Sequence, residues 1–389
     1  MYNIATLNKI SPVGLNKLTD NYTLIDEIDQ ATGIMVRSQD MKEMEFSENL
    51  LAIARAGAGV NNIPIERCAE QGIVVFNTPG ANANAVKELV IGGILLAARN
   101  IPDGIKWASS LTENVSKAVE KGKSQFAGTE ISGKTLGVIG LGAIGVLVAN
   151  AAQQLGMKVI GYDPFISLKS AHNLSNTIPV TDDIGQLLPQ CDYVTLHVPA
   201  TENTTGMFDQ RRFAQMKDNA VLLNFSRDKL VNEKALLEAL ENEKISKYVT
   251  DFPTDNLIGK KNIILLPHLG ASTKEAEDNC AVMAAEQLME YIEKGNVVNS
   301  VNFPACSMGE LNPEAHSRIC ILNKNIPSML GKITGIMSEH NVNIRDLTNK
   351  SKGDYAVTLM DIDSEISESE LRSALEIEGI IKVRIINCK

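Results

Sequence analysis

Three side chains in the middle of the chain, Arg227, Asp255 and His268, are suited to acid–base and anion chemistry. Each comes shortly after a run of apolar residues that is typical of a buried β-strand. Ligands of open parallel α/β sheets bind outside the carboxyl ends of the strands, so we expect the three side chains to meet at one edge. A base, a carboxylate and an anion-binding arginine suit hydride transfer to or from a 2-hydroxy acid.

The residue types predict a role for each member of this set. Histidine titrates near neutral pH, so His268 is the predicted base for the hydroxyl proton. A neighbouring carboxylate would orient the imidazole, and Asp255 is the candidate. Arginine offers the planar pair of donors that a carboxylate needs, so Arg227 is predicted to hold the substrate carboxylate. The alternatives are a helix cap for His268, a surface ion pair for Arg227 and a solvated loop acid for Asp255.

A glycine-rich turn upstream predicts the hydride carrier. Residues 136–163 read as an apolar strand, a Gly-x-Gly-x-x-Gly turn, a helix, a second strand and an acid. Gly140 allows the tight turn, Gly142 lets the backbone approach a pyrophosphate, and Gly145 lets the helix pack closely. The helix N-terminus would attract that anion. Asp163 would bind the adenosine ribose and repel a 2′-phosphate, so the unit predicts NAD rather than NADP as the cofactor.

The elements that position these residues alternate between strands and helices. Two long apolar-periodic helices, near residues 84–99 and 273–294, bracket the glycine-rich unit, which suggests that one domain is inserted into another. We therefore predict an α/β fold with a Rossmann NAD-binding domain at 93–274. It would be inserted in a flavodoxin-like substrate domain formed by residues 1–92 and 275–300.

The C-terminal part predicts a third, smaller domain. Residues 301–316 contain two prolines, a glycine and little periodicity, which is typical of a linker. Residues 317–389 follow a βαββαβ pattern, which is typical of a ferredoxin-like domain.

Composition limits the classes of partner. The 389 residues include 37 basic and 47 acidic ones, for a net charge of −10. This balance argues against nucleic acid and anionic membranes, which bind basic surfaces. The N-terminus lacks a signal-peptide pattern, and the longest apolar stretch is about half a membrane span, so we expect a cytoplasmic protein. No metal-ligand spacing is present, and reduced thiols are expected at Cys68, Cys191, Cys280, Cys306, Cys320 and Cys388.

Several motifs resemble those of the D-2-hydroxyacid dehydrogenase family. Besides the glycine-rich turn, they are RAGAGVNNI at 55–63, VFNTP at 75–79, LNFSR at 223–227 and PHLGAST at 267–273. The resemblance implies NAD as cofactor, with Arg227, the carboxylate at Asp255 and His268 as the catalytic set. Among family members, the chain most resembles those that oxidise 3-phospho-D-glycerate to 3-phosphohydroxypyruvate, the first step towards L-serine.

The resemblance also implies ligand contacts outside the catalytic set. The backbone of Ala58 and Gly59 would bind the substrate carboxylate, and Asn82 would lie near the substrate or the nicotinamide. Arg37 resembles the arginine that binds the 3-phosphate, and Arg55 is a weaker candidate. Further cofactor contacts are expected at Ala143, Ile144, Val198, Pro199, Ser226, Asp251 and Gly270.

The C-terminal domain resembles an ACT domain through NKNIPSMLG at residues 323–331. The family's ACT domains pair edge to edge and bind L-serine, which implies a regulatory site with Asn323, Asn325 and Asn343, and a homodimer or homotetramer. Turn or capping roles for these asparagines, and a purely dimerising ACT domain, are the alternatives.

The chain departs from the family pattern at several positions. Ala143 replaces an arginine that is frequent beside the pyrophosphate, and Asp255 is one methylene shorter than the usual glutamate. Asp251 is shifted by one position against the family's Asp-x-Phe. Residues 228–230 lack the usual glycines, and Ser328 replaces a glycine of the ACT motif.

Two other functions stay open from the sequence. One is a different D-2-hydroxyacid dehydrogenase, acting on 2-hydroxyglutarate or on glyoxylate and hydroxypyruvate. The other is a non-catalytic NAD-sensing binding protein, which the pair of Arg227 and His268 argues against.

Overall fold

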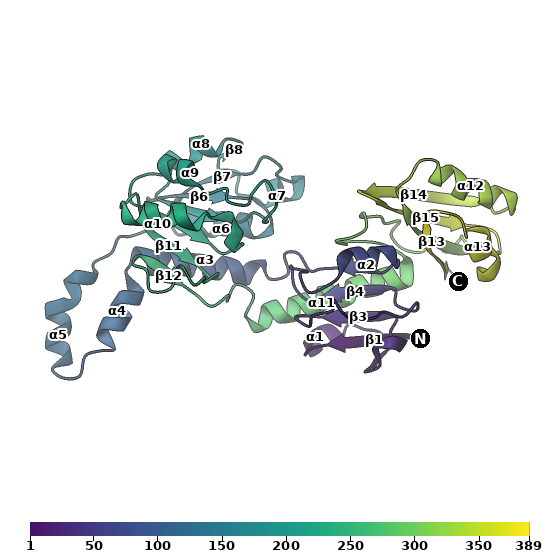
Figure 1. The fold of residues 1–389 in the computed structure, drawn as a ribbon, viewed down its shortest axis with the longest axis horizontal. Helices are drawn as coiled ribbons and strands as arrows, with labels where there is room; N and C mark the ends of the chain where they lie inside the picture. The colour runs from purple at the N-terminus through teal and green to yellow at the C-terminus, as the bar shows by residue number, and fades with distance from the viewer. Residues whose placement is uncertain (389) are drawn as a thin grey trace. The chain divides into compact units, whose positions relative to one another are not determined.

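The computed structural model describes residues 1–388 and contains three β-sheets (Figure 1). The chain divides into two compact units, one formed by Met1–Ala81 with Glu277–Lys389 and the other by Asn82–Ala276. The three sheets confirm the predicted fold class, a Rossmann domain together with a flavodoxin-like and a ferredoxin-like sheet. No helix in the described residues is long and apolar enough to cross a membrane.

The first unit begins with a five-stranded parallel sheet. Its strand order β2-β1-β3-β4-β5 is the flavodoxin-like order. The strands are β1 (Tyr2–Leu7), β2 (Tyr22–Ile25), β3 (Gly33–Val36), β4 (Ala52–Arg55) and β5 (Val74–Phe76). The central strand β3 is fully buried, as expected for a parallel strand covered on both faces. The short helical segments around it are α1 (Pro12–Leu15), η1 (Ile28–Gln30) and α2 (Ile65–Glu70), and the chain returns through α11 (Lys274–Lys294).

The second unit contains a seven-stranded parallel sheet with the order β12-β11-β10-β9-β6-β7-β8. This is the doubly wound Rossmann order extended by one strand. The strands are β6 (Thr135–Ile139), β7 (Lys158–Tyr162), β8 (Val180–Thr181), β9 (Tyr193–Leu196), β10 (Ala220–Asn224), β11 (Ile245–Thr250) and β12 (Ile263–Leu265).

Helices cover both faces of this sheet. Helix α6 (Ala143–Gln154) follows the glycine turn, and Val148, Ala149 and Ala152 on it are fully buried against the core. Figure 1 shows α4 (Ile101–Ala108) and α5 (Val115–Gly122) as a helical hairpin that projects from the sheet. The other helical segments are α3 (Ala83–Ala98), η2 (Lys123–Phe126), α7 (Leu168–Asn173), α8 (Ile184–Leu187), η3 (Leu188–Gln190), α9 (Gln210–Gln215), η4 (Asp228–Leu230) and α10 (Glu233–Glu241).

The C-terminal module is a four-stranded antiparallel sheet of order β14-β15-β13-β16, which is the ferredoxin-like topology. Its elements are β13 (Ser317–Lys324), α12 (Met329–Glu339), β14 (Ile344–Lys352), β15 (Tyr355–Ile362), α13 (Glu368–Ala374) and β16 (Ile380–Asn387). One face of the sheet packs on its own helices, where Ile319, Ile333 and Leu371 belong to one buried cluster. Cys320 and Leu322 on the other face join the core of the first unit beside Leu288.

Two buried arginines attach this module to the end of α11. Arg318 makes a bidentate ion pair with Asp361, at 2.7 and 3.1 Å, and also donates to the carbonyl oxygen of Lys294 at 3.2 Å. Arg384 donates to the carbonyl oxygens of Tyr291 at 3.2 Å and Ile292 at 2.6 Å. The last carbonyls of a helix lack partners within the helix, so these cations satisfy them and complement the negative end of the helix dipole.

Candidate active site

The predicted cofactor turn joins β6 to α6, and its three glycines meet different requirements. Gly140 has φ +94°, and a Cβ there would lie 2.6 Å from the carbonyl oxygen of His197. A Cβ on Gly145 would lie 1.8 Å from the carbonyl oxygen of Gly140. A Cβ on Gly142, in contrast, would meet no protein atom within 4 Å. Packing therefore explains the first two glycines, whereas the close approach of a ligand explains Gly142.

The N-terminus of α6 is open to an anion. Gly142 is the N-cap residue, and no side chain caps this end of the helix. The first N–H groups of a helix have no partner within it, so those of Ala143 and Ile144 can donate to a pyrophosphate. Ala143 adds no side-chain donor, so the backbone and the helix dipole must hold the anion.

Asp163 connects the end of β7 to the glycine turn. One carboxylate oxygen accepts from the amide of Leu141 at 2.8 Å, and the other accepts from the amide of Phe165 at 2.9 Å. Each carboxylate oxygen has a second lone pair, so the same group can also accept from ribose hydroxyls. Asp163 therefore shapes the turn besides fitting the predicted ribose contact.

The buried side chain of Asn224 positions the loop that carries Arg227. Its amide nitrogen donates to the carbonyl oxygen of Arg227 at 2.8 Å, and its amide oxygen accepts from the backbone N–H of Ser226 at 3.1 Å. The hydroxyl of Ser226 donates to the carbonyl oxygen of Val198 at 2.9 Å, which joins this loop to the one after β9. Pro199 follows Val198 in that loop and is exposed. These hydrogen bonds hold the backbone of the loop in place, while the side chain of Arg227 is exposed.

His268 follows β12 in a left-handed conformation, with φ 48°. Such a conformation is costly for a residue with a Cβ and is concentrated at functional sites. Its imidazole is exposed, and the ring of Phe252 meets it edge-on with 4.8 Å between the ring centroids. The loop after β11 thereby supports one side of the predicted base.

Asp251 is the buried acid of this edge, with 1% of its surface exposed. One carboxylate oxygen accepts from the amide of Gly270 at 3.1 Å, and the other has no hydrogen-bond partner in residues 1–388. Burial raises the pKa of Asp251, whereas the Gly270 amide and the charges of His268 and Arg227 oppose this rise. A buried acceptor without a partner at this edge fits the carboxamide N–H of a nicotinamide. The residues present therefore fit NAD.

The structure does not bring Asp255 into contact with His268. Asp255 is exposed on the loop after β11, and its side chain makes no hydrogen bond or ion pair with any described residue. The charges of His268 and Arg227 oppose the rise in the pKa of Asp251, so this buried acid lies within electrostatic range of both side chains.

The residues expected to bind the substrate are placed in two units. Arg37 follows β3 in the first unit and forms an ion pair with Glu277 of α11 at 2.8 Å. Ala58 and Gly59 lie in the loop after β4, and neither amide donates a hydrogen bond within residues 1–388. Unpaired amides in a loop can bind a carboxylate. Asn82 begins the second unit as the N-cap residue of α3, and its side chain makes no capping bond.

The three asparagines of the expected regulatory site lie at opposite ends of the C-terminal sheet. Asn323 pairs with Ala356 at one end, whereas Ile344, next to Asn343, pairs with Ile362 at the other. The side chain of Asn325 donates to the carbonyl oxygen of Gly353 at 3.0 Å, and that of Asn343 donates to Asp363 at 3.0 Å. One module therefore does not unite the three residues. Ser328 has φ 68°, a conformation that explains why a glycine would suit this position.

The sequence analysis did not predict the buried polar residues whose hydrogen bonds support the loops of the site. Asn224 and Thr250 end two neighbouring strands and are fully buried. For Asn224 the signal is a polar side chain that ends an otherwise apolar strand, whereas β11 contains other polar residues and gives no such signal for Thr250. His197 lies just after β9, and its ring contacts the Thr195 hydroxyl at 3.0 Å. Burial lowers the pKa of His197 to about 3, so the ring is neutral near pH 7.

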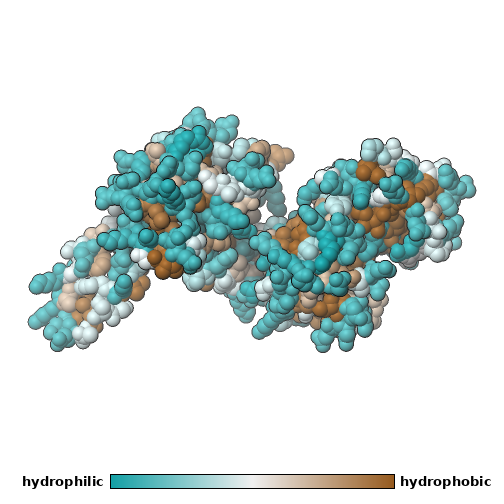
Figure 2. Space-filling model, in the orientation of Figure 1, coloured by the Kyte–Doolittle hydropathy of each residue, from teal (hydrophilic) through white to brown (hydrophobic). Residues whose placement is uncertain are grey.

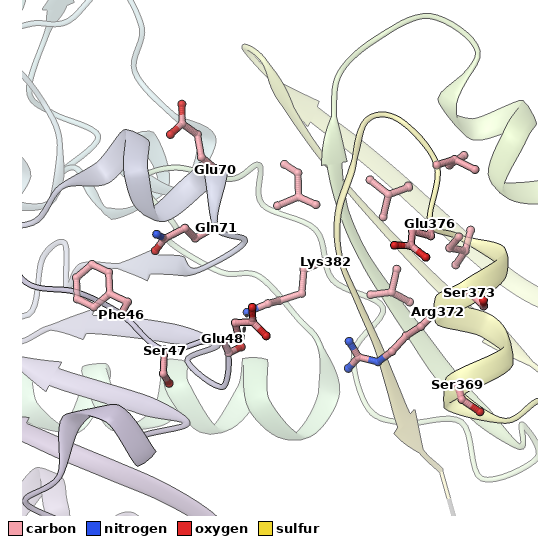
Figure 3. Close-up of a pocket in the computed structure, with 15 residues that line it drawn as sticks. Phe46, Ser47, Glu48, Glu70, Gln71, Ser369, Arg372, Ser373, Glu376 and Lys382 are labelled. Atoms are coloured by element: carbon pink, nitrogen blue, oxygen red, sulfur yellow. Dashed lines mark hydrogen bonds between the residues drawn. The ribbon is translucent and has the colours of Figure 1, made fainter.

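A cavity of about 1040 Å³ lies in the first unit, between the loops at residues 46–48 and 70–71 and the C-terminal module (Figure 3). Its lining mixes acids and cations, including Glu48, Glu376, Arg372 and Lys382. Lys382 donates to the carbonyl oxygen of Leu50 at 2.8 Å, and burial lowers its pKa to about 8. The mixed charge selects no one class of ligand, and none of the expected site residues lines this cavity.

Comparison with known proteins identifies the family. The family described as "D-isomer specific 2-hydroxyacid dehydrogenase, NAD binding domain" matches residues 91–270. The chain is 40% identical over 304 residues to D-3-phosphoglycerate dehydrogenase of Methanocaldococcus jannaschii, covering 75% of this chain and 56% of that protein. It is 33% identical over 379 residues to D-3-phosphoglycerate dehydrogenase 2 of Saccharomyces cerevisiae, covering 91% and 77%.

Solved structures agree with this relationship. NAD⁺-bound 3-phosphoglycerate dehydrogenase of Entamoeba histolytica is 26% identical with a TM-score of 0.61, covering 77% of this chain and 98% of that chain. D-mandelate dehydrogenase of Rhodotorula graminis, at 19% identity and a TM-score of 0.67, shares the fold over 79% of this chain and 99% of that chain. The chain belongs to the D-isomer-specific 2-hydroxyacid dehydrogenase family, and its middle portion is the family's NAD-binding domain.

Proposed function

We propose that this chain oxidises 3-phospho-D-glycerate to 3-phosphohydroxypyruvate with NAD, the first step towards L-serine. The observation that carries the proposal is the edge formed by the loops after β10, β11 and β12. There the His268 amide donates to the Asp251 carbonyl oxygen at 3.0 Å, and the Asn224 side chain donates to the carbonyl oxygen of Arg227 at 2.8 Å. The relatives named above carry the name of this activity and support the substrate.

The residues of this edge divide the reaction between them. Bound NAD would supply the acceptor for the hydride that leaves C2 of the substrate. The imidazole of His268 takes the proton of the C2 hydroxyl, so that the alcohol carbon becomes a ketone. Arg227 holds the substrate carboxylate through paired N–H donors. The free carboxylate oxygen of Asp251 would hold NAD by accepting from the nicotinamide carboxamide.

We propose that residues of the first unit, together with Asn82 of the second, bind the remainder of the substrate. The free amides of Ala58 and Gly59 would donate to the substrate carboxylate, and Asn82 would contact the substrate or the nicotinamide. Arg37 would bind the 3-phosphate by exchanging its partner Glu277 for the dianion. Asp255 would join His268 only if its loop moved, because its carboxylate has no partner among residues 1–388.

The assay that tests the proposal follows NAD reduction by purified protein with 3-phosphoglycerate, 2-hydroxyglutarate, glycolate and lactate. Turnover with 3-phosphoglycerate at the highest kcat/KM is the expected result. Turnover with another hydroxy acid but none with 3-phosphoglycerate would reject the substrate while keeping the chemistry. NAD binding without any turnover would favour a non-catalytic sensor.

One observation favours a second candidate. Glu277 neutralises Arg37 at 2.8 Å, and a substrate without a phosphate would leave this ion pair intact. Oxidation of 2-hydroxyglutarate, or reduction of glyoxylate or hydroxypyruvate, is therefore the alternative. Replacing Arg37 with Met separates the two, because it would raise the KM for a phosphorylated substrate only.

We propose further that the C-terminal module is an ACT-like regulatory domain. Asn323 and Asn325 of one copy and Asn343 of another would bind L-serine, since one sheet keeps them at opposite ends.

The assembly would be a homodimer or homotetramer in the cytoplasm. Exposed apolar side chains on the α4–α5 hairpin, visible in brown in Figure 2, support association between copies, and they include Ile105 and Val115. Calorimetry with L-serine and light scattering test these two proposals.

A further inference from the structure

The buried hydroxyl of Thr250 connects the loops that follow β10 and β11. Thr250 ends β11 and is fully buried. Its hydroxyl donates to the backbone carbonyl oxygen of Asn224 at 2.8 Å, and its oxygen accepts from the backbone amide of Phe252 at 3.1 Å. One side chain thus fixes the end of β10 and the start of the loop after β11.

Each end of this connection reaches a residue of the proposed reaction. Asn224 holds Arg227 and Ser226 by side-chain hydrogen bonds of 2.8 and 3.1 Å. The ring of Phe252 meets His268 edge-on at 4.8 Å. A buried hydroxyl that both donates and accepts allows little freedom, because breaking either bond leaves a buried polar group without a partner.

We propose that Thr250 is a positioning residue that sets the distance between the Arg227 guanidinium and the His268 imidazole. It touches neither substrate nor cofactor, and it acts through Asn224 on one side and through Phe252 on the other. The inference rests on the proposed roles of Arg227 and His268 in the reaction. A purely structural threonine would contribute to stability without affecting the kinetic constants.

Substitutions that alter only the hydroxyl test this role. Thr250→Val keeps the shape and removes both hydrogen bonds, whereas Thr250→Ser keeps both. We expect Thr250→Val to lower kcat and raise the KM for the hydroxy acid, with a combined loss on the order of 10–100-fold in kcat/KM, since small misplacements of catalytic groups have such effects. NAD affinity should change less than twofold, and Thr250→Ser should restore near-normal constants.

A matched control removes a similar hydroxyl elsewhere. Thr358 in β15 is also fully buried, and its hydroxyl accepts from the side chain of Asn349 at 2.7 Å. Thr358→Val should lower the unfolding midpoint without changing kcat or KM. Wild-type kinetics in Thr250→Val at a matched folded fraction, or equal impairment in Thr250→Ser, would overturn the inference.

A second variant and crystal structures keep the test valid if Thr250→Val does not fold or if the wild type is inactive. Phe252→Leu retains the hydrogen bond from its backbone amide to the Thr250 hydroxyl and removes the ring that packs against His268. It should lower kcat and leave the KM for the hydroxy acid unchanged. This variant replaces Thr250→Val if that protein does not fold. Crystal structures of wild type, Thr250→Ser and Thr250→Val test the inference even if the protein has no activity. Arg227 and His268 should be displaced in Thr250→Val and should keep their wild-type positions in Thr250→Ser. Unmoved side chains reject the inference, whereas an inactive wild type rejects the proposed function.

Discussion

The backbone amide of His268 donates to the carbonyl oxygen of Asp251, with 3.0 Å between nitrogen and oxygen. This bond draws the loop after β12 onto the end of β11, and the Gly270 amide adds a second bond to the Asp251 carboxylate at 3.1 Å. The loop that carries the proposed base is therefore built around a buried acid, which keeps one oxygen for a ligand.

Asp251→Asn and Asp255→Asn should have different effects. An asparagine at 251 has only one acceptor oxygen for both the Gly270 amide and the nicotinamide carboxamide, so the Kd for NAD should rise about tenfold. The Asp255 side chain makes no hydrogen bond or ion pair with a described residue, so Asp255→Asn should leave kcat/KM within about threefold of wild type. A loss with Asp255→Asn as large as that of a His268 variant would show that Asp255 reaches the base during turnover.

Gly142→Ala should weaken NAD binding without destabilising the fold. A Cβ there meets no protein atom within 4 Å, and the residue has an ordinary φ of −76°. The methyl group would instead contact the pyrophosphate, and fluorescence titration should show an increase in Kd of about tenfold or more. Gly92→Ala in α3 is the control, since its Cβ also meets nothing and NAD affinity should stay unchanged. Equal affinities in wild type and Gly142→Ala would place the pyrophosphate elsewhere.

The glycine turn and the two strand-end side chains could be predicted from the sequence, because local sterics and strand ends determine them. Gly140 and Gly145 are required by contacts within a few residues or with the adjacent strand. The place of Arg227 and His268 at the carboxyl edge of the sheet could be predicted because each follows an apolar strand, and ligands of such sheets bind at that edge.

The supporting residues could not be predicted, because their contacts cross between strands that are distant in the sequence. Thr250 meets Asn224 only once β10 and β11 are placed in register. The conformation of the loop after β11, which leaves Asp255 exposed, follows from no periodic pattern. Arg318 reads as a surface cation, and only the docking of the C-terminal sheet on α11 explains its burial.

The buried pair of Arg318 and Asp361 should be sensitive to the loss of either partner. Asp361→Asn leaves a buried guanidinium with an uncompensated charge, and unfolding of the first unit should become easier by about 3–5 kcal/mol. Asp363→Asn is the control, since its partner Arg345 is largely exposed and the unfolding midpoint should not change. Chemical denaturation followed by circular dichroism measures both. Equal midpoints for the two variants would contradict the attachment by Arg318.

His197 should make the second unit less stable in acid. Its ring stays neutral in the fold because burial lowers its pKa from 6.5 to about 3. The unfolded chain binds the proton below pH 6.5, so stability falls as the pH decreases from 6.5 towards 3, by about 1.4 kcal/mol per pH unit. Between pH 6.5 and 4.5, His197→Gln should therefore lose about 2 kcal/mol less than wild type in urea unfolding, because the full slope is reached only well below pH 6.5. Parallel pH profiles would contradict a neutral buried ring.

His268 is the proposed base for hydride transfer from a 2-hydroxy acid. The most direct measurement is NAD reduction by wild type and His268→Asn with saturating 3-phosphoglycerate, together with the Kd for NAD of each. We predict that His268→Asn lowers kcat by roughly 10²–10⁴-fold and leaves NAD affinity unchanged. A near-normal kcat in His268→Asn would show that His268 is not the base.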